Sequence, residues 1–379
     1  MTMWIMIMWA SIAVIITSLF YVSARVPNFL DMFDIAEWEK FKQFSLGLLV
    51  TLGVTGILAF FIDFINALIC VLYLAMILAV SEVVFWVLQK ISGITFEHYY
   101  AGWIALLITG IALISGWYLD HKVWQTDYEI TTNKKIPNLK IAMFADSHIG
   151  TTFNGEGFAK HLQKIQAQNP DLVVVVGDYV DDGTKKEDMI IATRALGKLK
   201  TKYGVYYVSG NHDKGYYGAA HRGFSEADLI NELKNNGITV LQDEAVLLND
   251  SVYIIGRQDY SVMKEQRGYR KSIEELTTDL DKNKYMLVLD HQPVEYNKDA
   301  EAEVDLVLSG HTHGGQLFPF NQVGKWIKAN DLVYGHEKRQ NTDFIVTSGI
   351  SDWAIKFKTG TKSEYVIINL KSNENTEQK

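Results

Sequence analysis

The sequence predicts a chain in two parts, an α-helical membrane region followed by an α/β domain with a mixed sheet or two packed sheets. Residues 1–24 contain no charged side chain and are almost wholly apolar. Residues 1–119 contain only four of the 36 Lys and Arg residues in the 379-residue chain. From Asp120 onward, short apolar runs typical of strands alternate with stretches of helical periodicity. The later strands have too few helices between them for a purely parallel sheet.

Four segments are apolar and long enough to cross a bilayer as helices, since about 20 apolar residues suffice for one crossing. They are residues 3–24, 44–62, 67–88 and 99–119. The first lacks a basic n-region and a polar c-region, which favours a retained span over a cleaved signal peptide. The sequence therefore predicts a multi-pass cell-membrane protein with the lipid bilayer as a partner.

Glu82 is the one acidic side chain clearly inside a predicted span. Acids within the membrane are often functional. Glu82 lies about two helical turns from the polar end at Gln89 and Lys90. Snorkelling or a hydrogen bond to another helix is therefore the favoured interpretation, and a functional role is the alternative.

The basic residues near the spans favour an extracytoplasmic α/β domain by a narrow margin. The connections at 25–43 and 89–98 carry Arg25, Lys40, Lys42 and Lys90, whereas Lys122, Lys134 and Lys135 follow the fourth span. The positive-inside rule then places those two connections in the cytoplasm. Four spans put both termini on the opposite side, together with the α/β domain.

The composition of the chain excludes one class of partner and indicates where the domains begin and end. Residues 120–379 carry 32 basic and 37 acidic residues without a basic run, which argues against nucleic acid as a partner. The single Cys70 cannot form an intrachain disulfide, and the sequence leaves the oligomeric state open. We expect a linker at 120–138, the α/β domain at 139–370 and a polar, disordered tail at 371–379.

Within the α/β domain, the continuous valines of Leu172–Val176 are typical of a strand buried on both faces. One helix begins at Ser225 as N-cap, has Asp228 at its third helical position and ends before Gly237. Strands are predicted at 139–145, 172–176, 205–208, 238–241, 252–255, 285–289, 305–308, 344–347 and 365–368, and helices at 157–168, 185–200 and 225–236.

Five of these strands are each followed by a block of side chains that bind hard metal ions. The blocks are Asp146-Ser147-His148, Gly177-Asp178, Gly210-Asn211-His212-Asp213, Asp290-His291 and Gly310-His311-Thr312-His313. One such block alone is explained equally well as a polar loop. Five blocks that all leave the carboxyl ends of strands predict a common site at the sheet edge, where open α/β sheets place their ligands.

These blocks resemble the signature of the calcineurin-like metallophosphoesterase superfamily, which is D-x-H, GD, GNH-D/E, a lone H and GHxH in that order. The form Gly310-His311-Thr312-His313-Gly314-Gly315-Gln316 and the preceding spans look most like its membrane-associated bacterial branch. The resemblance covers residues 140 to 370. It implies a four-layer α/β/β/α sandwich with two metal ions at the strand ends, and a phosphoric ester hydrolase.

The resemblance also implies which residues bind each metal ion. One ion would be held by Asp146, His148, Asp178 and His313. The second would be held by Asp178, Asn211, His291 and His311, so that Asp178 bridges the two. Since every ligand atom is O or N and none is a thiolate, two divalent or mixed-valence ions of Mn, Fe or Zn suit the set.

His212 matches the family's catalytic histidine, which is not a ligand and would protonate the leaving oxygen. Asp181 lies three residues past the bridging ligand, where it would orient His212. Asp182 stands where the similar phosphoprotein phosphatases have a phosphate-binding arginine, and an acid there argues against a protein phosphatase. Arg222 is a candidate replacement for that arginine, or a surface residue.

These observations predict a membrane-anchored enzyme that hydrolyses a phosphomonoester, phosphodiester or pyrophosphate. Four spans exceed the need of a simple anchor, which favours a lipid-linked phosphate. Trp326, Trp353, Phe318 and Phe320 would form an apolar wall for its acyl chain, or would pack over a sheet edge. The alternatives are a non-catalytic membrane regulatory or binding module on this fold, and a membrane sensor or transporter. The complete set of ligands argues against the first, and the lack of a polar pathway through the spans argues against the second.

Overall fold

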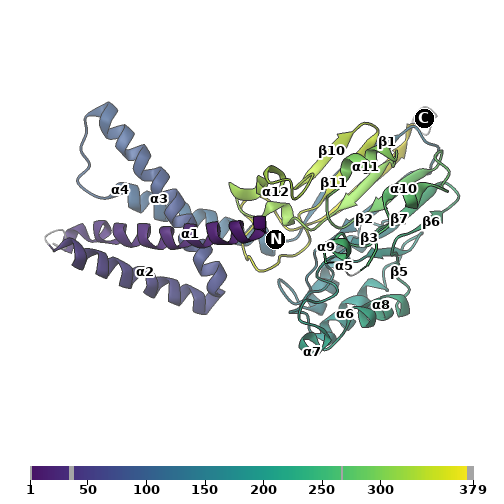
Figure 1. The fold of residues 1–379 in the computed structure, drawn as a ribbon, viewed down its shortest axis with the longest axis horizontal. Coiled ribbons are helices and arrows are strands. Elements are labelled where there is room, and N and C mark those ends of the chain that lie inside the picture. Colours follow the sequence, from purple (N-terminus) through teal and green to yellow (C-terminus); the bar gives the residue numbers. More distant parts are fainter. Residues whose placement is uncertain (1, 34–37, 266–267, 374–379) are drawn as a thin grey trace. The chain divides into compact units, whose positions relative to one another are not determined.

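The computed structural model describes residues 2–33, 38–265 and 268–373. It divides the chain into two compact units, Met1–Ser115 and Gly116–Lys379 (Figure 1). The first unit is helical and ends a few residues before the predicted boundary at residue 119. The second contains every strand in the described part of the chain.

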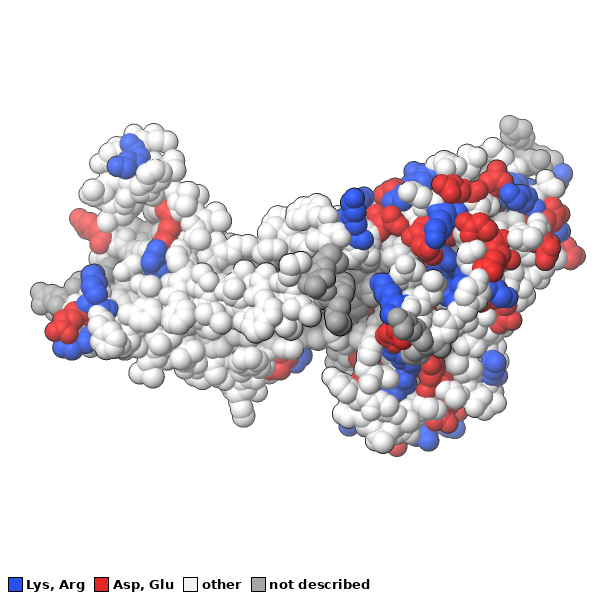
Figure 2. Space-filling view, viewed as in Figure 1, with Lys and Arg blue, Asp and Glu red and all other residues white. Residues whose placement is uncertain are grey.

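The first unit consists of α1 (Thr2–Arg25), η1 (Val26–Phe33), α2 (Lys40–Ile62), α3 (Phe64–Ser92) and most of α4 (Tyr100–His121). Among the described residues, four helices are long and apolar enough to cross a membrane: Met8–Leu30, Lys40–Ile62, Phe64–Ser92 and Tyr100–His121. These helices present large apolar side chains outward, Phe60 being 84% exposed. On the face shown in Figure 2 their few acidic and basic side chains gather toward one end and most of the remaining surface is uncharged, whereas acidic and basic side chains are interspersed over the α/β unit. Such a surface suits hydrocarbon rather than water.

Glu82 joins three segments of the helical unit. Its carboxylate accepts hydrogen bonds from Arg25 Nε at 2.7 Å, from Arg25 Nη2 at 3.1 Å and from the Tyr21 hydroxyl at 2.7 Å. The hydroxyl of Tyr99 also donates to it. The structure therefore supports the favoured interpretation of Glu82 as a helix–helix contact.

The α/β unit contains two six-stranded mixed sheets in its described residues. The first has the order β1-β12-β2-β3-β4-β5, with β1 (Trp124–Thr132), β12 (Glu364–Ser372), β2 (Leu139–Phe144), β3 (Leu172–Val176), β4 (Val205–Val208) and β5 (Thr239–Val240). The second has the order β10-β11-β9-β8-β7-β6, with β10 (Gly335–Arg339), β11 (Thr342–Val346), β9 (Leu306–Ser309), β8 (Tyr285–Leu289), β7 (Val252–Gly256) and β6 (Glu244–Leu248). The neighbours β2, β3 and β4 are parallel, and so are β7, β8 and β9. The prediction of mixed, packed sheets is confirmed.

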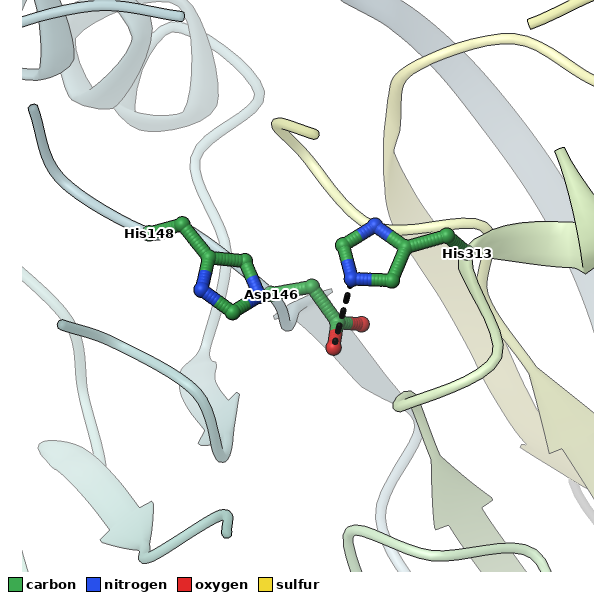
Figure 3. A group of neighbouring side chains, drawn as sticks. All are labelled: Asp146, His148 and His313. Carbon is green, nitrogen blue, oxygen red and sulfur yellow. Dashed lines mark ion pairs between the residues drawn. The ribbon is translucent and has the colours of Figure 1, made fainter. Parts of the chain in front are cut away.

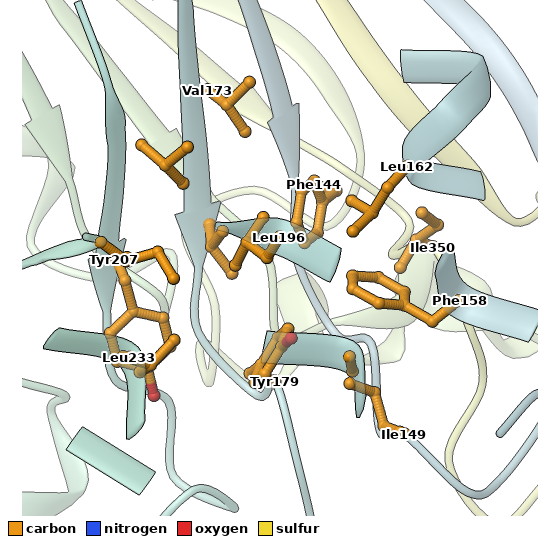
Figure 4. Packing of buried hydrophobic residues seen from close by; sticks show 14 of the residues in the cluster. Phe144, Ile149, Phe158, Leu162, Val173, Tyr179, Leu196, Tyr207, Leu233 and Ile350 are labelled. Carbon is orange, nitrogen blue, oxygen red and sulfur yellow. The ribbon is translucent and has the colours of Figure 1, made fainter. Parts of the chain in front are cut away.

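The side chains of β3 show how the layers are built. Leu172, Val174 and Val176 belong to the apolar cluster shared with strands of the second sheet. Val173 and Val175 point the other way, into the cluster that they form with helices α5 (Gly155–Gln166), α6 (Lys186–Leu196) and α8 (Glu226–Asn235) (Figure 4). A third cluster packs the second sheet against α10 (Ile273–Thr277) and α11 (Tyr296–Glu301). The layers are therefore α/β/β/α, as predicted, and the valine run is uninterrupted because both faces of β3 are buried.

Sequence patterns predicted an element well where short-range interactions alone determine where it begins or ends. Ser225 caps α8 and forms a reciprocal capping box with Asp228, as the sequence predicts. The remaining short helices are α7 (Ala219–Arg222), α9 (Ser261–Lys264), α12 (Val323–Trp326), η3 (His313–Gly315) and η4 (Phe320–Gln322).

The structure differs from the sequence-based boundaries in two places. Residues 124–132, assigned to a linker, form β1 and pair in parallel with β12 along their whole length. Lys371 and Ser372, assigned to the disordered tail, are the last residues of β12. Most of β1 is only partly buried, so it lacks the apolar signal of an inner strand. Asn373 is described as well, and the remaining residues of the predicted tail, 374–379, lie outside the described residues.

Candidate metal centre

The five polar blocks lie at the carboxyl ends of neighbouring parallel strands. Those after β2, β3 and β4 leave the first sheet, and those after β8 and β9 leave the second. Backbone hydrogen bonds join successive loops, including Asp146 N to Gly177 O at 3.0 Å and Gly310 N to His291 O at 3.0 Å. The sheet order therefore brings together side chains that are up to 167 residues apart in the printed numbering, Asp146 and His313.

The backbone at this edge adopts an uncommon conformation. Five of the seven predicted ligands have positive φ angles: Asp146 (54°), His148 (35°), Asp178 (50°), His311 (71°) and His313 (48°). Such angles cost about 1–3 kcal/mol per non-glycine residue and cluster at functional sites. Gly177 also has φ of 78°, and a Cβ there would run into the ring of His291. Tight turns and close loops therefore aim the ligands inward.

Asp146, His148 and His313 form the first group of potential metal ligands (Figure 3). Asp146 and His148 are fully buried, and His313 is 8% exposed. His313 Nε2 lies 3.7 Å from Asp146 Oδ1, and the rings of His148 and His313 are stacked 5.2 Å apart. The two imidazoles lie on either side of the carboxylate, which leaves one ligand atom of each residue near a common point.

Asp178, His291 and His311 form the second group. His291 Nδ1 lies 2.8 Å from the carbonyl oxygen of Val176 and donates its proton there, which leaves the lone pair on Nε2. Nε2 lies 3.0 Å from Asp178 Oδ2. The carbonyl thus orients the imidazole toward the carboxylate in the tautomer that a metal ion requires.

Asp178 lies between the two groups. Its Oδ2 atom is 3.0 Å from His291 Nε2 and 3.9 Å from His148 Nε2, while Oδ1 accepts the backbone N–H of His212 at 2.7 Å. A carboxylate in this position could be shared by two cations.

The donor atoms fit divalent cations. His148 Nε2, His291 Nε2 and Asn211 Oδ1 are buried and have no hydrogen-bond partner among the described residues. A buried polar atom without a partner costs about 1–3 kcal/mol. Two cations, one near each group, would satisfy all three atoms. The unpartnered oxygen of Asn211 is a specific reason to include this residue in the second set.

Electrostatics favour the same conclusion. Burial raises the pKa of Asp146 to about 6 and lowers the pKa of His311 to about 4. Burial also lowers the pKa of His313, to well below its ordinary value, so both imidazoles are neutral at pH 7. Burial acts to lower the pKa of His291 too, but the Asp178 carboxylate outweighs it and raises this pKa well above the ordinary value. Because ligands must be deprotonated, a cation here would displace that proton.

His212 lies beside the first group without belonging to either. Its ring is half-buried and 5.1 Å from that of His148, and burial lowers its pKa. Its Nδ1 atom has no hydrogen-bond partner in the described part of the chain.

Asp181 is placed differently from the prediction. Its Oδ2 atom lies 3.4 Å from Nδ1 of His148, whereas no hydrogen bond to His212 is present among the described residues. The reason is local, because Gly183 N donates to Asp181 Oδ1 at 2.8 Å and holds the carboxylate in its own turn. Because Asp181 lies three residues after Asp178, it is brought to the site. This spacing does not determine whether its carboxylate faces His148 or His212.

Arg222 matches neither alternative from the sequence, since it is not a surface residue and its guanidinium is not free to bind phosphate. It is buried, and its guanidinium donates to the backbone carbonyls of Asp213 (2.6 Å), Phe224 (3.1 Å) and Asp181 (3.4 Å). It therefore links the loops after β3 and β4, and these hydrogen bonds occupy the N–H groups that a phosphate would need.

Two residues that support the site were not assigned a role from the sequence. Asp213 accepts the N–H groups of Val180 (3.0 Å) and Gly210 (2.7 Å), so it joins two ligand loops, and its place in the fourth position of its block was the available signal. Lys358 is fully buried and donates to the carbonyls of Ser348 (2.7 Å) and Ser351 (3.0 Å). It stands in an ordinary polar stretch, so no sequence signal marked it.

The fold and the two adjoining groups define an α/β/β/α protein whose clustered Asp and His side chains could hold metal ions. Residues 139–315 match the family model described as calcineurin-like phosphoesterase. The chain is 33% identical over 195 residues to an uncharacterized metallophosphoesterase of Aquifex aeolicus, a match that covers 50% of this chain and 70% of the relative. The chain belongs to the calcineurin-like metallophosphoesterase family.

Two further relatives are similar over more of the chain. An uncharacterized metallophosphoesterase of Campylobacter jejuni is 34% identical over 253 residues, covering 66% of this chain and 63% of the relative. A transmembrane protein with metallophosphoesterase domain from Danio rerio is 28% identical over 279 residues, covering 71% of this chain and 62% of the relative. The chain therefore spans less than two thirds of the length of these two proteins. The four apolar helices and the Danio rerio name suggest membrane association.

Proposed function

We propose that this protein is a membrane-anchored phosphoesterase with two divalent metal ions, which hydrolyses a phosphomonoester, phosphodiester or pyrophosphate. The observation that carries the proposal is the position of Asp178 between two buried Asp/His groups. Shared carboxylates of this kind serve in-line displacement at phosphorus.

The residues fall into three roles. Asp146, His148 and His313 would hold one cation, and Asn211, His291 and His311 the other, with Asp178 shared. When bound, the two cations would polarise the phosphoryl oxygens and lower the pKa of a water at the site. His212 would donate a proton to the leaving oxygen, since it lies beside the first group and is not part of it. Asp181 would hold His148 in place through Nδ1.

A lipid-linked phosphate is the substrate class we favour. The four apolar helices would keep the domain at a bilayer, and Phe320 and Trp326 are 44% and 70% exposed rather than packed over a sheet edge. Exposed aromatic side chains are typical of membrane–water interfaces. A soluble substrate would give them no comparable partner.

The direct test is hydrolysis of a panel of phosphoesters, lipid phosphates included, by the detergent-solubilised full chain. We expect turnover with Mn²⁺ that disappears with a chelator and returns when Mn²⁺, Fe²⁺ or Zn²⁺ is added, because all the assigned ligand atoms are O or N. Turnover that persists after metal content has fallen to zero would refute the proposal. Binding of two metal equivalents with no hydrolysis of any ester would favour a non-catalytic module.

We further propose that the α/β unit is extracytoplasmic. Protease added to intact cells should then digest residues 120–379, because basic residues gather on the connections that would be cytoplasmic. Digestion of a cytoplasmic marker in the same sample would invalidate the assay, so such a marker is the control. Protection of the segment until the cells are lysed would reverse the assigned topology.

A further inference from the structure

We infer that the leaving group of the substrate carries a positive charge, such as a primary or quaternary ammonium, and binds in a pocket beside His212. This inference rests on the proposed function and narrows its substrate class. The pocket, here called the leaving-group pocket, is a cavity of about 370 Å³ lined by Asp181, Asp182, His212, Tyr216, Tyr217 and Trp353.

The position of the pocket assigns it to the leaving group. His212 forms part of its wall and also lies beside the first group of metal ligands, with its ring 5.1 Å from that of His148. Phosphate held between the two Asp/His groups would therefore lie on one side of His212 and the pocket on the other. The group that receives the proton of His212 is the group that departs toward the pocket.

Aromatic side chains supply one part of the recognition. The ring of Trp353 is 4.9 Å from the ring of His212, and the ring of Tyr216 is 5.3 Å from it. Trp353, Tyr216 and Tyr217 are 46%, 50% and 75% exposed, so they present their surfaces to an incoming ligand. Aromatic faces attract cations, and recognition of ammonium groups by several rings is a known use of this attraction.

Tyr216 already shows this property toward a cation of the protein itself. Lys214 Nζ lies 4.4 Å from the centre of its ring and also pairs with Glu265. Lys214 covers one face of the Tyr216 ring without lining the pocket, so Trp353 and Tyr217 are the two rings of the lining that no cation of the protein is shown to occupy, and they contribute most to binding a ligand.

Acidic side chains supply the other part. Among the residues that the structure describes, no Lys or Arg lines the pocket, whereas Asp181 and Asp182 do. Asp182 Oδ1 accepts the backbone N–H of Tyr217 at 3.0 Å, which fixes the carboxylate in the wall. The guanidinium of Arg222 interacts electrostatically with Asp182, but it does not line the pocket and donates to three backbone carbonyls, so the carboxylates are the charged groups in the pocket wall.

The negative charge of the pocket favours some of the substrates that the proposed function allows and disfavours others. A pyrophosphate or nucleotide leaving group would bring negative charge next to Asp182 and would be repelled. A neutral planar group would gain the aromatic contacts but nothing from the carboxylates. An ammonium gains from both, so a phosphoester of an amino alcohol fits best.

The test uses two phosphoesters that differ only in charge. Phosphocholine and 3,3-dimethylbutyl phosphate have leaving groups of the same shape, with a quaternary nitrogen in one and a carbon in the other. With the Mn²⁺-loaded full chain in detergent, we expect kcat/KM to be at least about tenfold higher for phosphocholine. In Asp182→Asn this preference should fall to about twofold or less, while hydrolysis of the neutral ester continues. The exposed Glu187 lies outside the pocket, and Glu187→Gln should keep the preference.

Binding of both esters, measured by calorimetry on the same proteins, keeps the inference separate from turnover. Absence of hydrolysis of these esters and of p-nitrophenyl phosphate would contradict the proposed function alone, provided that the binding preference and its loss in Asp182→Asn persist. Equal binding and equal kcat/KM for the two esters, or a preference unchanged in Asp182→Asn, would overturn the inference. Faster hydrolysis of pyrophosphate than of phosphocholine would overturn it too.

Discussion

Asp178→Asn should remove most of the bound metal and nearly all hydrolysis. The substitution keeps the shape of the side chain and removes the negative charge between the two groups, where Oδ2 lies 3.0 Å from His291 Nε2 and 3.9 Å from His148 Nε2. Both cation sites lose a ligand at once. Loss of an outer partner of a ligand costs about 10–100-fold in affinity or activity, so loss of a shared ligand should cost more. Metal content by mass spectrometry and initial rates with p-nitrophenyl phosphate esters measure both effects.

Asp279→Asn serves as the matched control, since Asp279 is exposed and belongs to neither metal-ligand group. It should keep full metal content and rate. If Asp178→Asn also kept full activity, the two-metal mechanism would be wrong. Loss of the folded state in Asp178→Asn, visible as an altered circular dichroism spectrum, would be addressed with Asp178→Glu, which restores the charge and should recover part of the metal.

His212→Ala should behave in the opposite way with respect to metal. We expect full metal content and a rate lower by about 10²–10⁴, the range for a positioned general acid. The physical reason is that His212 lies beside the first group, with ring centres 5.1 Å apart, but belongs to neither group of ligands. The loss should be smaller with p-nitrophenyl phosphate than with an alkyl phosphate, because nitrophenolate leaves readily without a proton.

That dependence on the leaving group distinguishes proton donation from a purely structural role, which would lower all rates alike. The exposed His221 provides the control, and His221→Ala should leave rates and metal content unchanged. Loss of metal from His212→Ala would show that His212 is a ligand and that its assignment is wrong.

The clustering of the Asp and His side chains at one sheet edge was largely predictable because each polar block is encoded locally. A polar block directly after a buried strand must emerge at that strand's carboxyl end, and parallel neighbours bring these ends to one edge. This holds for Asp146 and His148 after β2 and for His311 and His313 after β9. The capping box at Ser225 and the double-faced burial of β3 are likewise properties of short segments.

Contacts between distant segments were not predictable in the same way. β1 reads as a linker because its partner β12 is 240 residues further along the chain and most of its side chains are only partly buried. Asp181 faces His148 rather than His212 because the backbone N–H of Gly183 holds its carboxylate. The spacing of residues along the sequence does not predict this orientation.

The sequence by itself determined the class of fold, the four apolar helices and the set of metal-competent side chains, since periodicity and residue order are local properties of the chain. The family resemblance already implied the division of those side chains between two sites that share Asp178, and the tertiary structure supplied the geometry, with Asp178 Oδ2 3.0 Å from His291 Nε2 and 3.9 Å from His148 Nε2. Only the tertiary structure brought Asp182, Tyr217 and Trp353 to one pocket beside His212. The direction of a side chain depends on the backbone angles of its turn and on packing against segments far away in the sequence. The residues next to it in the chain determine neither.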